Sequence, residues 1–156
     1  MIQLEIPGFG NLEGTDLVLD INGTLSFDGA LLPGVAARCR QLARRLDIHL
    51  LTADTRGTAA AIAAELGVDL TRVQPGEEAA QKRRFVEQLG GANVIAIGNG
   101  NNDEQMLRAA GLGIAVLGAE GTATRAILAA DIVARDIEEA LDLLLQPTRI
   151  LATLRC

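Results

Sequence analysis

The chain has 156 residues, a size that favours a single domain able to bury roughly two thirds of the surface that its unfolded form exposes. Its formal net charge is −6, and its apolar residues are mainly aliphatic, with three Phe and neither Trp nor Tyr. Nucleic acids and anionic membranes attract clustered Lys and Arg, and bases stack on aromatic rings, so this composition argues against both as partners.

Residues 1–13 have the pattern of two short strands around a Pro-Gly-rich turn at Pro7–Gly10. We expect a β-hairpin here that packs on the edge of a larger sheet. The segment lacks a basic region followed by a long apolar one, and no apolar segment approaches the length of a membrane span. Cys39 and Cys156 fit neither a disulfide framework nor a zinc site, which favours a reducing, cytoplasmic setting.

From Asp16 onward, short apolar runs alternate with amphipathic segments, a pattern typical of a parallel sheet with helices on both faces. We therefore predict a three-layer, Rossmann-like α/β fold with about six parallel strands. The expected strands are 17–19, 48–51, 70–73, 94–97, 112–117 and 132–134, and the expected helices are 33–46, 58–66, 77–89, 102–110, 122–130 and 137–145.

The predicted organisation is one domain over residues 1–156, with the hairpin in 1–13, the α/β core in 14–145 and a short tail in 147–156. Pro147 breaks the chain before the tail, whose apolar stripe either covers the core or contacts a partner. Cys39 lies on the apolar stripe of the first helix, so we interpret it as a core residue.

Polar residues follow three of the expected strands. Asp20 ends the first parallel strand, Thr52 follows the second, and Gly98-Asn99-Gly100 ends the fourth. Ligands of doubly wound sheets bind beyond the carboxyl ends of the strands, near the point where the strand order reverses. If these strands are neighbours, the polar groups converge on one site.

Two further charged residues lie on helical stripes that should face the core. Lys82 precedes Phe85, Val86 and Leu89 by three, four and seven residues, so it points inward and needs a charged partner. Asp103 has the same relation to later apolar residues, but it also lies in a first helical turn. There it could simply favour the helix dipole or cap the helix, in competition with Asn102.

Asp20, Thr52, Lys82 and Asp103 together have the composition of a phosphoryl-transfer site that depends on a divalent cation. A carboxylate can attack phosphorus and hold the metal, a hydroxyl and backbone N–H groups can bind phosphate oxygens, and a lysine can neutralise charge. Gly23 allows a tight turn after Asp20, and Thr24 can cap that turn.

These segments, in this order, resemble the motifs of the haloacid dehalogenase (HAD) superfamily of phosphotransferases. Asp20–Leu25, D-I-N-G-T-L, is similar to the first motif, Thr52 to the second and Lys82 to the third. Gly98–Asp103, G-N-G-N-N-D, is similar to the fourth, and a later pattern extends the likeness to about Leu145. Within the superfamily the chain most resembles small soluble P-type ATPase-like proteins of prokaryotes.

The resemblance implies that Asp20 is the nucleophile of a Mg²⁺-dependent phosphatase or phosphotransferase and becomes an aspartyl-phosphate. It assigns catalysis to Asp20, Asn22, Thr52 and Lys82, phosphate binding to Ile21, Asn22, Gly23, Thr52, Ala53 and Lys82, and Mg²⁺ to Asp20, Asn22, Asn99 and Asp103. Asn22 would hold the metal through its backbone carbonyl, and Asp103 would either complete the metal site or orient Lys82.

Two residues depart from the family pattern. Asn22 stands where phosphatases of the family carry an Asp as general acid and base, and an amide cannot do this work, at a cost on the order of 10²- to 10⁴-fold. Asn99 replaces a metal-binding Asp, which removes a negative charge and should weaken Mg²⁺ binding. A slow phosphatase and a phosphate-binding or regulatory module without turnover therefore both stay open.

No insertion is large enough for a cap domain. Capless relatives generally act on large substrates or close the site with a neighbouring subunit, so a homo-oligomer that completes an open site is one expectation. The hairpin predicted at Leu25–Leu31, the N-terminal hairpin and the tail are the segments that could make such contacts.

Other interpretations fit less well. A dinucleotide site at Gly98–Gly100 fails because Asp103 occupies the third glycine position. In a phosphorylated receiver domain an earlier strand that carries an acidic pair would precede the acceptor, whereas Asp20 ends the first parallel strand. His49 lies in an apolar run, as a core or edge histidine would. Asp54 could cap the next helix or face the mouth of the site.

Overall fold

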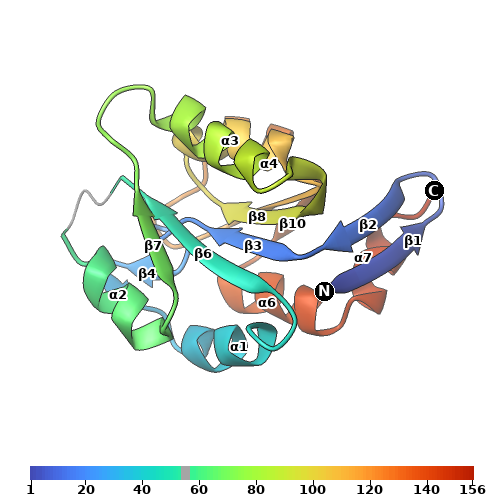
Figure 1. The fold of residues 1–156 in the computed structure, drawn as a ribbon, viewed down its shortest axis with the longest axis horizontal. Coiled ribbons are helices and arrows are strands. Elements are labelled where there is room, and N and C mark those ends of the chain that lie inside the picture. The colour runs from blue at the N-terminus through green and yellow to red at the C-terminus, as the bar shows by residue number, and fades with distance from the viewer. Residues whose placement is uncertain (54–56) are drawn as a thin grey trace.

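The computed structural model describes residues 1–53 and 57–156 and contains the predicted six-stranded parallel sheet (Figure 1). The strand order is β10-β9-β8-β3-β6-β7. The strands are β3 (Asp16–Leu19), β6 (Asp47–Thr52), β7 (Asp69–Arg72), β8 (Val94–Gly98), β9 (Leu112–Val116) and β10 (Ile132–Ala134). The predicted α/β fold is confirmed.

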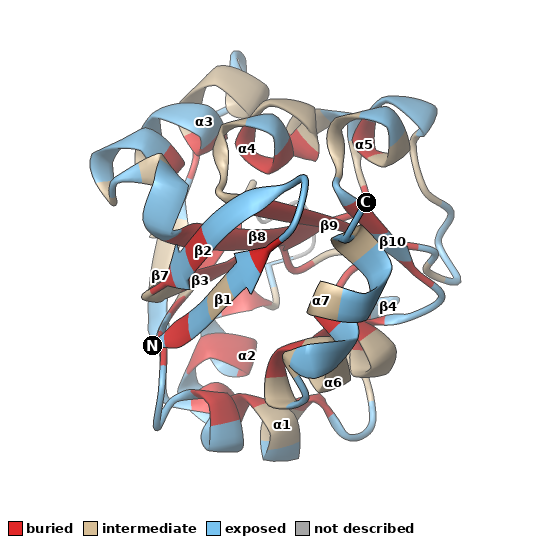
Figure 2. Ribbon diagram, turned by 90° about the vertical axis from the view of Figure 1, so that its right-hand side faces the viewer, coloured by how far each residue is buried: buried red, intermediate tan, exposed pale blue. Residues whose placement is uncertain are grey.

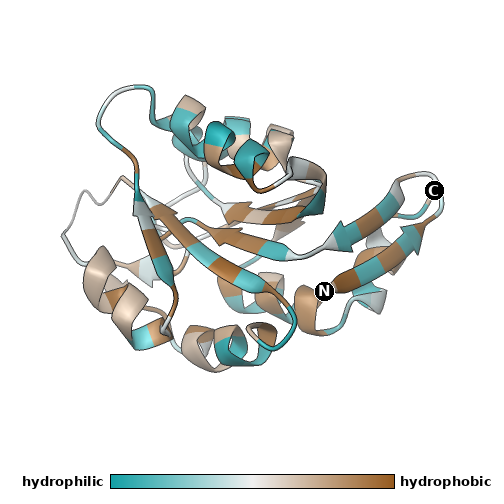
Figure 3. Cartoon of the chain, viewed as in Figure 1, coloured by the Kyte–Doolittle hydropathy of each residue, from teal (hydrophilic) through white to brown (hydrophobic). Residues whose placement is uncertain are grey.

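Helices cover both faces of the sheet because the strands alternate two buried sets of side chains. Leu17 and Leu19 of β3 belong to one apolar cluster with the helices α1 (Val35–Leu42), α2 (Ala59–Leu66) and α6 (Ile137–Leu145). Val18 belongs to a second cluster with α3 (Glu78–Gln88), α4 (Glu104–Ala109) and α5 (Thr124–Ala129). Figure 2 shows the buried strands between these helices, and Figure 3 shows the hydrophobic central strands and the more polar outer sides of α3 and α4.

The first helix is shorter than the expected 33–46. Gly34 adopts a left-handed φ of 77° before α1 begins, and residues 43–45 form turns after α1 ends. Leu46 is still buried in the core, so the apolar stripe extends beyond the helix that it predicted. Cys39 is buried as expected, and this burial raises the pKa of its thiol to about 11.

The strand order reverses between β3 and β8. From β3 the chain proceeds through β6 and β7 to one edge, then returns to β8 on the other side of β3 and continues through β9 to β10. The register pairs Leu19 with Leu50 of β6 and with Ile97 of β8. The residues that follow these three strands therefore meet at one end of the sheet.

The sequence suggested that the N-terminal hairpin packs on the edge of the main sheet, and this prediction is wrong. Strands β1 (Ile2–Ile6) and β2 (Gly10–Gly14) form their own antiparallel sheet and lead directly into the amino end of the central strand β3. Thr15 N–H donates to the carbonyl of Asn93 in the 3₁₀ turn η1 (Gly91–Asn93), which holds the hairpin at that end. The hairpin is therefore opposite the carboxyl ends of the strands.

The tail covers the core. It forms helix α7 (Thr148–Leu154), whose Ile150 is fully buried, and Cys156 N–H donates to the carbonyl of Pro7 in the N-terminal hairpin at 3.0 Å. The tail and the N-terminal hairpin thus support each other, away from the carboxyl end of β3 (Figure 1). Neither segment can close the site of its own chain.

A second hairpin follows Asp20, as predicted for Leu25–Leu31. Strands β4 (Ser26–Phe27) and β5 (Ala30–Leu31) pair antiparallel. The two residues between them, Asp28 and Gly29, have positive φ values of 49° and 83°. Positive φ at both central positions is the pattern of a type I′ turn, which matches the twist of a hairpin.

Among the helices of residues 1–53 and 57–156, none has both the length and the apolar character needed to cross a bilayer.

The N-terminus of α6 provides a test of the fold. The Asp136 side chain accepts a hydrogen bond from Glu139 N–H at 2.8 Å, so it caps the helix that buries Leu141 and Leu144. Asp136→Ala should lower the free energy of unfolding by about 1 kcal/mol, because a helix N–H group loses its acceptor. Urea unfolding measures this loss. Asp136→Asn keeps the acceptor and should lose little, so equal losses in the two variants would contradict the capping role.

Candidate active site

Asp20 lies directly after β3, at the point where the strand order reverses. Its side chain is nearly buried, and its backbone N–H continues the sheet by donating to the carbonyl of Ile97 at 3.0 Å. The chain then turns tightly: Thr24 N–H and Leu25 N–H both donate to the carbonyl of Ile21. The turn fixes the carboxylate at the carboxyl end of the sheet.

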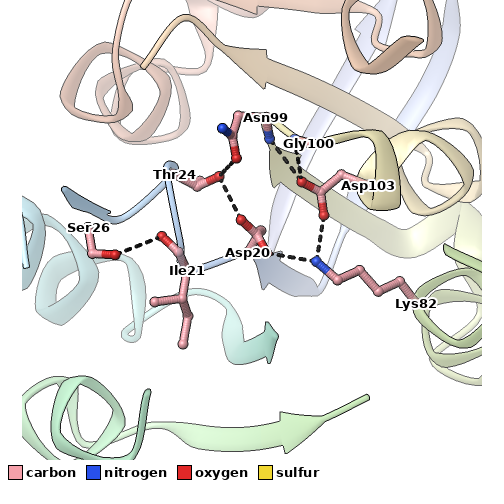
Figure 4. Close-up of polar contacts among 8 residues, drawn as sticks. All are labelled: Asp20, Ile21, Thr24, Ser26, Lys82, Asn99, Gly100 and Asp103. Carbon is pink, nitrogen blue, oxygen red and sulfur yellow. Dashed lines mark hydrogen bonds and ion pairs between the residues drawn. The ribbon is translucent and has the colours of Figure 1, made fainter. Parts of the chain in front are cut away.

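Lys82 extends from α3 to this carboxylate. Its Nζ donates to Asp20 Oδ1 at 2.7 Å and to Asp103 Oδ1 at 2.6 Å (Figure 4). The side chains of Lys82 and Asp103 are completely buried. Burial alone would lower the pKa of Lys82, but the attraction of the two carboxylates outweighs burial and raises it above its usual range. The inward lysine predicted from helical periodicity therefore has two charged partners.

The pKa of Asp20 is raised to about 6. Burial is the largest cause, and the negative charge of Asp103 is the second, while the ammonium of Lys82 and the hydroxyl of Thr24 act in the opposite direction. Two carboxylates share one ammonium, so the ionised site has one excess negative charge. Such a site favours an additional cation.

Asp103 both accepts local backbone N–H groups and holds Lys82, two roles that the sequence had left as alternatives. It ends the 3₁₀ turn η2 (Asn101–Asp103), and its Oδ2 accepts the N–H groups of Asn99 and Gly100 at 3.0 and 2.8 Å, as a local capping residue would. Its Oδ1 meanwhile holds Lys82. Gly98 allows this approach, since a Cβ there would lie 2.6 Å from Asp103 Cγ.

Thr24 has a larger part in the site than the sequence indicated. Its hydroxyl lies 3.0 Å from Asp20 Oδ2 and 3.0 Å from Asn99 Oδ1, so it connects the first motif to the end of β8. A hydroxyl has only one proton, so it can donate to only one of these oxygens at a time. The position of Thr24, four residues after the acid in the first motif, was the available signal.

The remaining predicted residues lie around this group. Thr52 is buried at the end of β6, beside the strand that carries Asp20, and Ala53 follows it, partly exposed. Asn22 is partly exposed and forms a bridge with Ser26. Gly23 has the left-handed φ of 78° that glycine tolerates, and its N–H donates to the carbonyl of Ser26 at 3.1 Å. Asp54 lies outside the described residues.

The oxygen atoms near Asp20 fit a hard divalent cation. In residues 1–53 and 57–156, no group of three or more His, Cys, Asp and Glu side chains could hold a metal ion. Asp20 Oδ2, Thr24 Oγ1 and Asn99 Oδ1 lie close together with one hydroxyl proton among them. Mg²⁺ prefers oxygen ligands, and this donor set is compatible with it, although it has less negative charge than a site with Asp at position 99.

His49 is not part of the site. Its Nε2 lies 2.8 Å from Asp16 Oδ1 and its ring contacts Phe85 edge-on at 5.7 Å between centroids. It lies beside β3 before the carboxyl end, as expected for a structural histidine at the margin of the core.

A family model for haloacid dehalogenase-like hydrolases matches residues 5–111. The match spans more than half of the chain and includes all four motifs, so the chain belongs to this family. The structure adds the six-stranded parallel sheet that was expected from the sequence.

Individual proteins are similar to about half of this chain. An uncharacterized protein of Methanocaldococcus jannaschii is 49% identical over 88 residues, which are 54% of this chain and 95% of the relative. A copper-exporting P-type ATPase of Staphylococcus aureus is 40% identical over 90 residues, which are 56% of this chain but only 10% of the ATPase. The resemblance to P-type ATPases is thus confirmed for the part of these proteins that the chain spans.

Solved structures share the fold. The 3-deoxy-D-manno-octulosonate 8-phosphate phosphatase of Moraxella catarrhalis, determined with magnesium, phosphate and KDO, has a TM-score of 0.68 and 18% identity. The superposition covers 92% of this chain and 94% of that one. At this identity the likeness shows a common architecture.

The raised pKa of Asp20 can be tested through its neighbours. Asp103→Asn removes a repelling charge, so the pKa of Asp20 in the metal-free protein should fall below 6. Thr24→Val removes a hydrogen bond to the carboxylate, so the pKa should rise. Carboxyl-carbon NMR titrations measure both shifts.

If Asp20 is the nucleophile, as the family resemblance implies, its phosphorylation should slow as the pH falls through its pKa, because protonation removes the attacking carboxylate. Bound Mg²⁺ would lower that pKa.

In the NMR titrations, pKa shifts of the same sign in Asp103→Asn and Thr24→Val would contradict the electrostatic explanation of the raised Asp20 pKa.

Proposed function

We propose that this chain is a slow Mg²⁺-dependent phosphatase or phosphotransferase that forms an aspartyl-phosphate on Asp20. The observation that carries the proposal is the placement of the Asp20 carboxylate at the strand-order reversal, where it shares the buried Lys82 ammonium with Asp103. This arrangement supplies a nucleophile, a fixed positive charge and an excess negative charge for a cation. Family membership and the phosphatase fold support it.

In the first step, a carboxylate oxygen of Asp20 attacks phosphorus and the bond from phosphorus to the leaving oxygen breaks. Lys82 stabilises charge on the phosphoryl oxygens, and Asp103 holds Lys82 in position for this role. The Thr52 hydroxyl and the backbone of residues 21–23 and Ala53 are the further groups that we assign to phosphate binding. Mg²⁺, when bound, would supply electrostatic stabilisation of the transferring phosphoryl group.

Asn22 limits both steps of the reaction. It cannot protonate the leaving oxygen, which must take a proton from solvent, and it cannot activate the water that attacks phosphorus in the second step. That second step releases inorganic phosphate and regenerates the Asp20 carboxylate. The expected result is a long-lived phosphoenzyme, and aryl phosphates should be the best substrates because their leaving groups need little protonation.

A second candidate function is favoured by the two amides. Asn22 removes the general acid and base, and Asn99 reduces the negative charge available to a metal, so the site would also suit a phosphate-binding or regulatory module without turnover. In either case we propose that the site binds a phosphorylated compound, as the substrate of an enzyme or as the ligand of a module without turnover. We propose that the chain works in the cytoplasm, in keeping with free Cys39 and Cys156, and that a second subunit completes the open site.

Restoring the missing acid should separate these functions. Asn22→Asp should raise turnover of an aryl phosphate at least about tenfold, because proton transfer contributes on the order of 10²- to 10⁴-fold in such reactions. Released phosphate and covalent phosphoenzyme, measured together with and without Mg²⁺, report the two steps. Asn11→Asp, at the exposed N-terminal hairpin, is the matched control for added charge.

Asp20→Asn should abolish covalent labelling by an acyl phosphate. Labelling that persisted in this variant would remove Asp20 from the nucleophile role. A wild-type protein that neither binds Mg²⁺ nor forms a phosphoenzyme would favour the module without turnover.

A further inference from the structure

The turn at residues 118–121, between β9 and α5, contacts three separate parts of the candidate site. Gly121 N–H donates to the carbonyl of Gly118 at 3.0 Å, which closes the turn. Gly118 packs directly on the nucleophile turn, since a Cβ at Gly118 would lie 2.5 Å from the carbonyl oxygen of Gly23. Glu120 Oε1 accepts the N–H of Asp28 at the tip of the β4–β5 hairpin at 2.9 Å.

Asn99 is held at two points, by Gly121 of this turn and by Ala123 just after it. Ala123 N–H donates to the backbone carbonyl of Asn99 at 2.8 Å, and Asn99 Nδ2 donates to the carbonyl of Gly121 at 2.9 Å. In Figure 4 the side-chain oxygen of Asn99 points toward Thr24 and the nitrogen points away. The carbonyl of Gly121 therefore holds the amide nitrogen outward, while the Thr24 hydroxyl can donate to the amide oxygen.

This orientation matters because asparagine is not symmetric. An aspartate at position 99 would present an oxygen whichever way it rotated, whereas a rotated Asn99 would direct N–H groups at Thr24 and Asp20 and repel a cation. A site that uses asparagine here needs a device that keeps the oxygen facing inward. The carbonyl of Gly121 is such a device only while residues 118–121 stay in place.

We propose that Glu120 is a positioning residue: by binding the Asp28 N–H, it anchors residues 118–121 to the β4–β5 hairpin and so keeps the Asn99 oxygen directed toward Asp20. The part of this inference that concerns a cation rests on the proposed function. The part that concerns the Asn99 amide does not, because it is a property of the metal-free protein.

The Asn99 side-chain amide protons provide the first test. In metal-free Glu120→Ala, solvent exchange of these protons should accelerate at least about fivefold, because their acceptor is no longer held. Glu120→Gln keeps an acceptor oxygen for Asp28 N–H and should resemble the wild type. Glu65→Ala, on the exposed side of α2, controls for the lost surface charge. Unchanged exchange in Glu120→Ala would overturn the proposal, even if the protein binds no Mg²⁺.

Mg²⁺ affinity, measured by calorimetry, provides the second test. Loss of a group that hydrogen-bonds a metal ligand typically weakens metal binding about 10- to 100-fold. Glu120 acts on Asn99 only through Gly121 and is therefore one contact further from the metal, so its removal should raise the Kd for Mg²⁺ by about three- to tenfold. In an Asn99→Asp background, where either rotation presents an oxygen, Glu120→Ala should have little effect. An equal loss of affinity in both backgrounds would overturn the orientation argument.

Discussion

The ammonium of Lys82 lies between the carboxylates of Asp20 and Asp103, and the site depends on this buried group of charges. A charged lysine with no exposed surface is stable only with such partners, and the loss of one partner from a buried ion pair typically costs about 3–5 kcal/mol. The three residues come from the end of β3, from α3 and from η2, so the ion pairs also fix these elements relative to one another. The stability of this part of the fold and the chemistry of the site therefore share the same contacts.

Close backbone packing brings the remaining groups to the charges. Gly23, Gly98 and Gly118 each lack the side chain that would collide with Asn99, Asp103 or the turn after Asp20. Thr24 then connects Asp20 with Asn99 across the β3–β8 boundary. The Thr24 hydroxyl can donate its single proton to Asp20 Oδ2 or to Asn99 Oδ1, but not to both. The oxygen that does not receive this proton is available to a cation.

The two amides give this chain its own character within the haloacid dehalogenase-like hydrolases. In the proposed mechanism Asn22 cannot transfer a proton, whereas the proposed nucleophile Asp20 and its positive partner Lys82 are in place. Asn99 keeps an oxygen near Asp20, and the structure supplies Gly121 to orient it. Because the proposed nucleophile and the ammonium that would bind a phosphoryl group are both in place, we favour a slow enzyme over a module without turnover.

Much of this organisation was determined by the sequence alone. The continuous apolar runs predicted the parallel sheet, because strands covered on both faces must be apolar on both sides, and helical periodicity identified Lys82 and Asp103 as inward-facing. Local patterns could not decide contacts between distant segments. The place of the N-terminal hairpin, the division of Asp103 between Lys82 and two backbone N–H groups, and the contact of Asp28 with Glu120 all depend on chain segments that only tertiary packing brings together. The sequence thus identified which residues carry the charges, and the packing of the sheet decided which atoms they face.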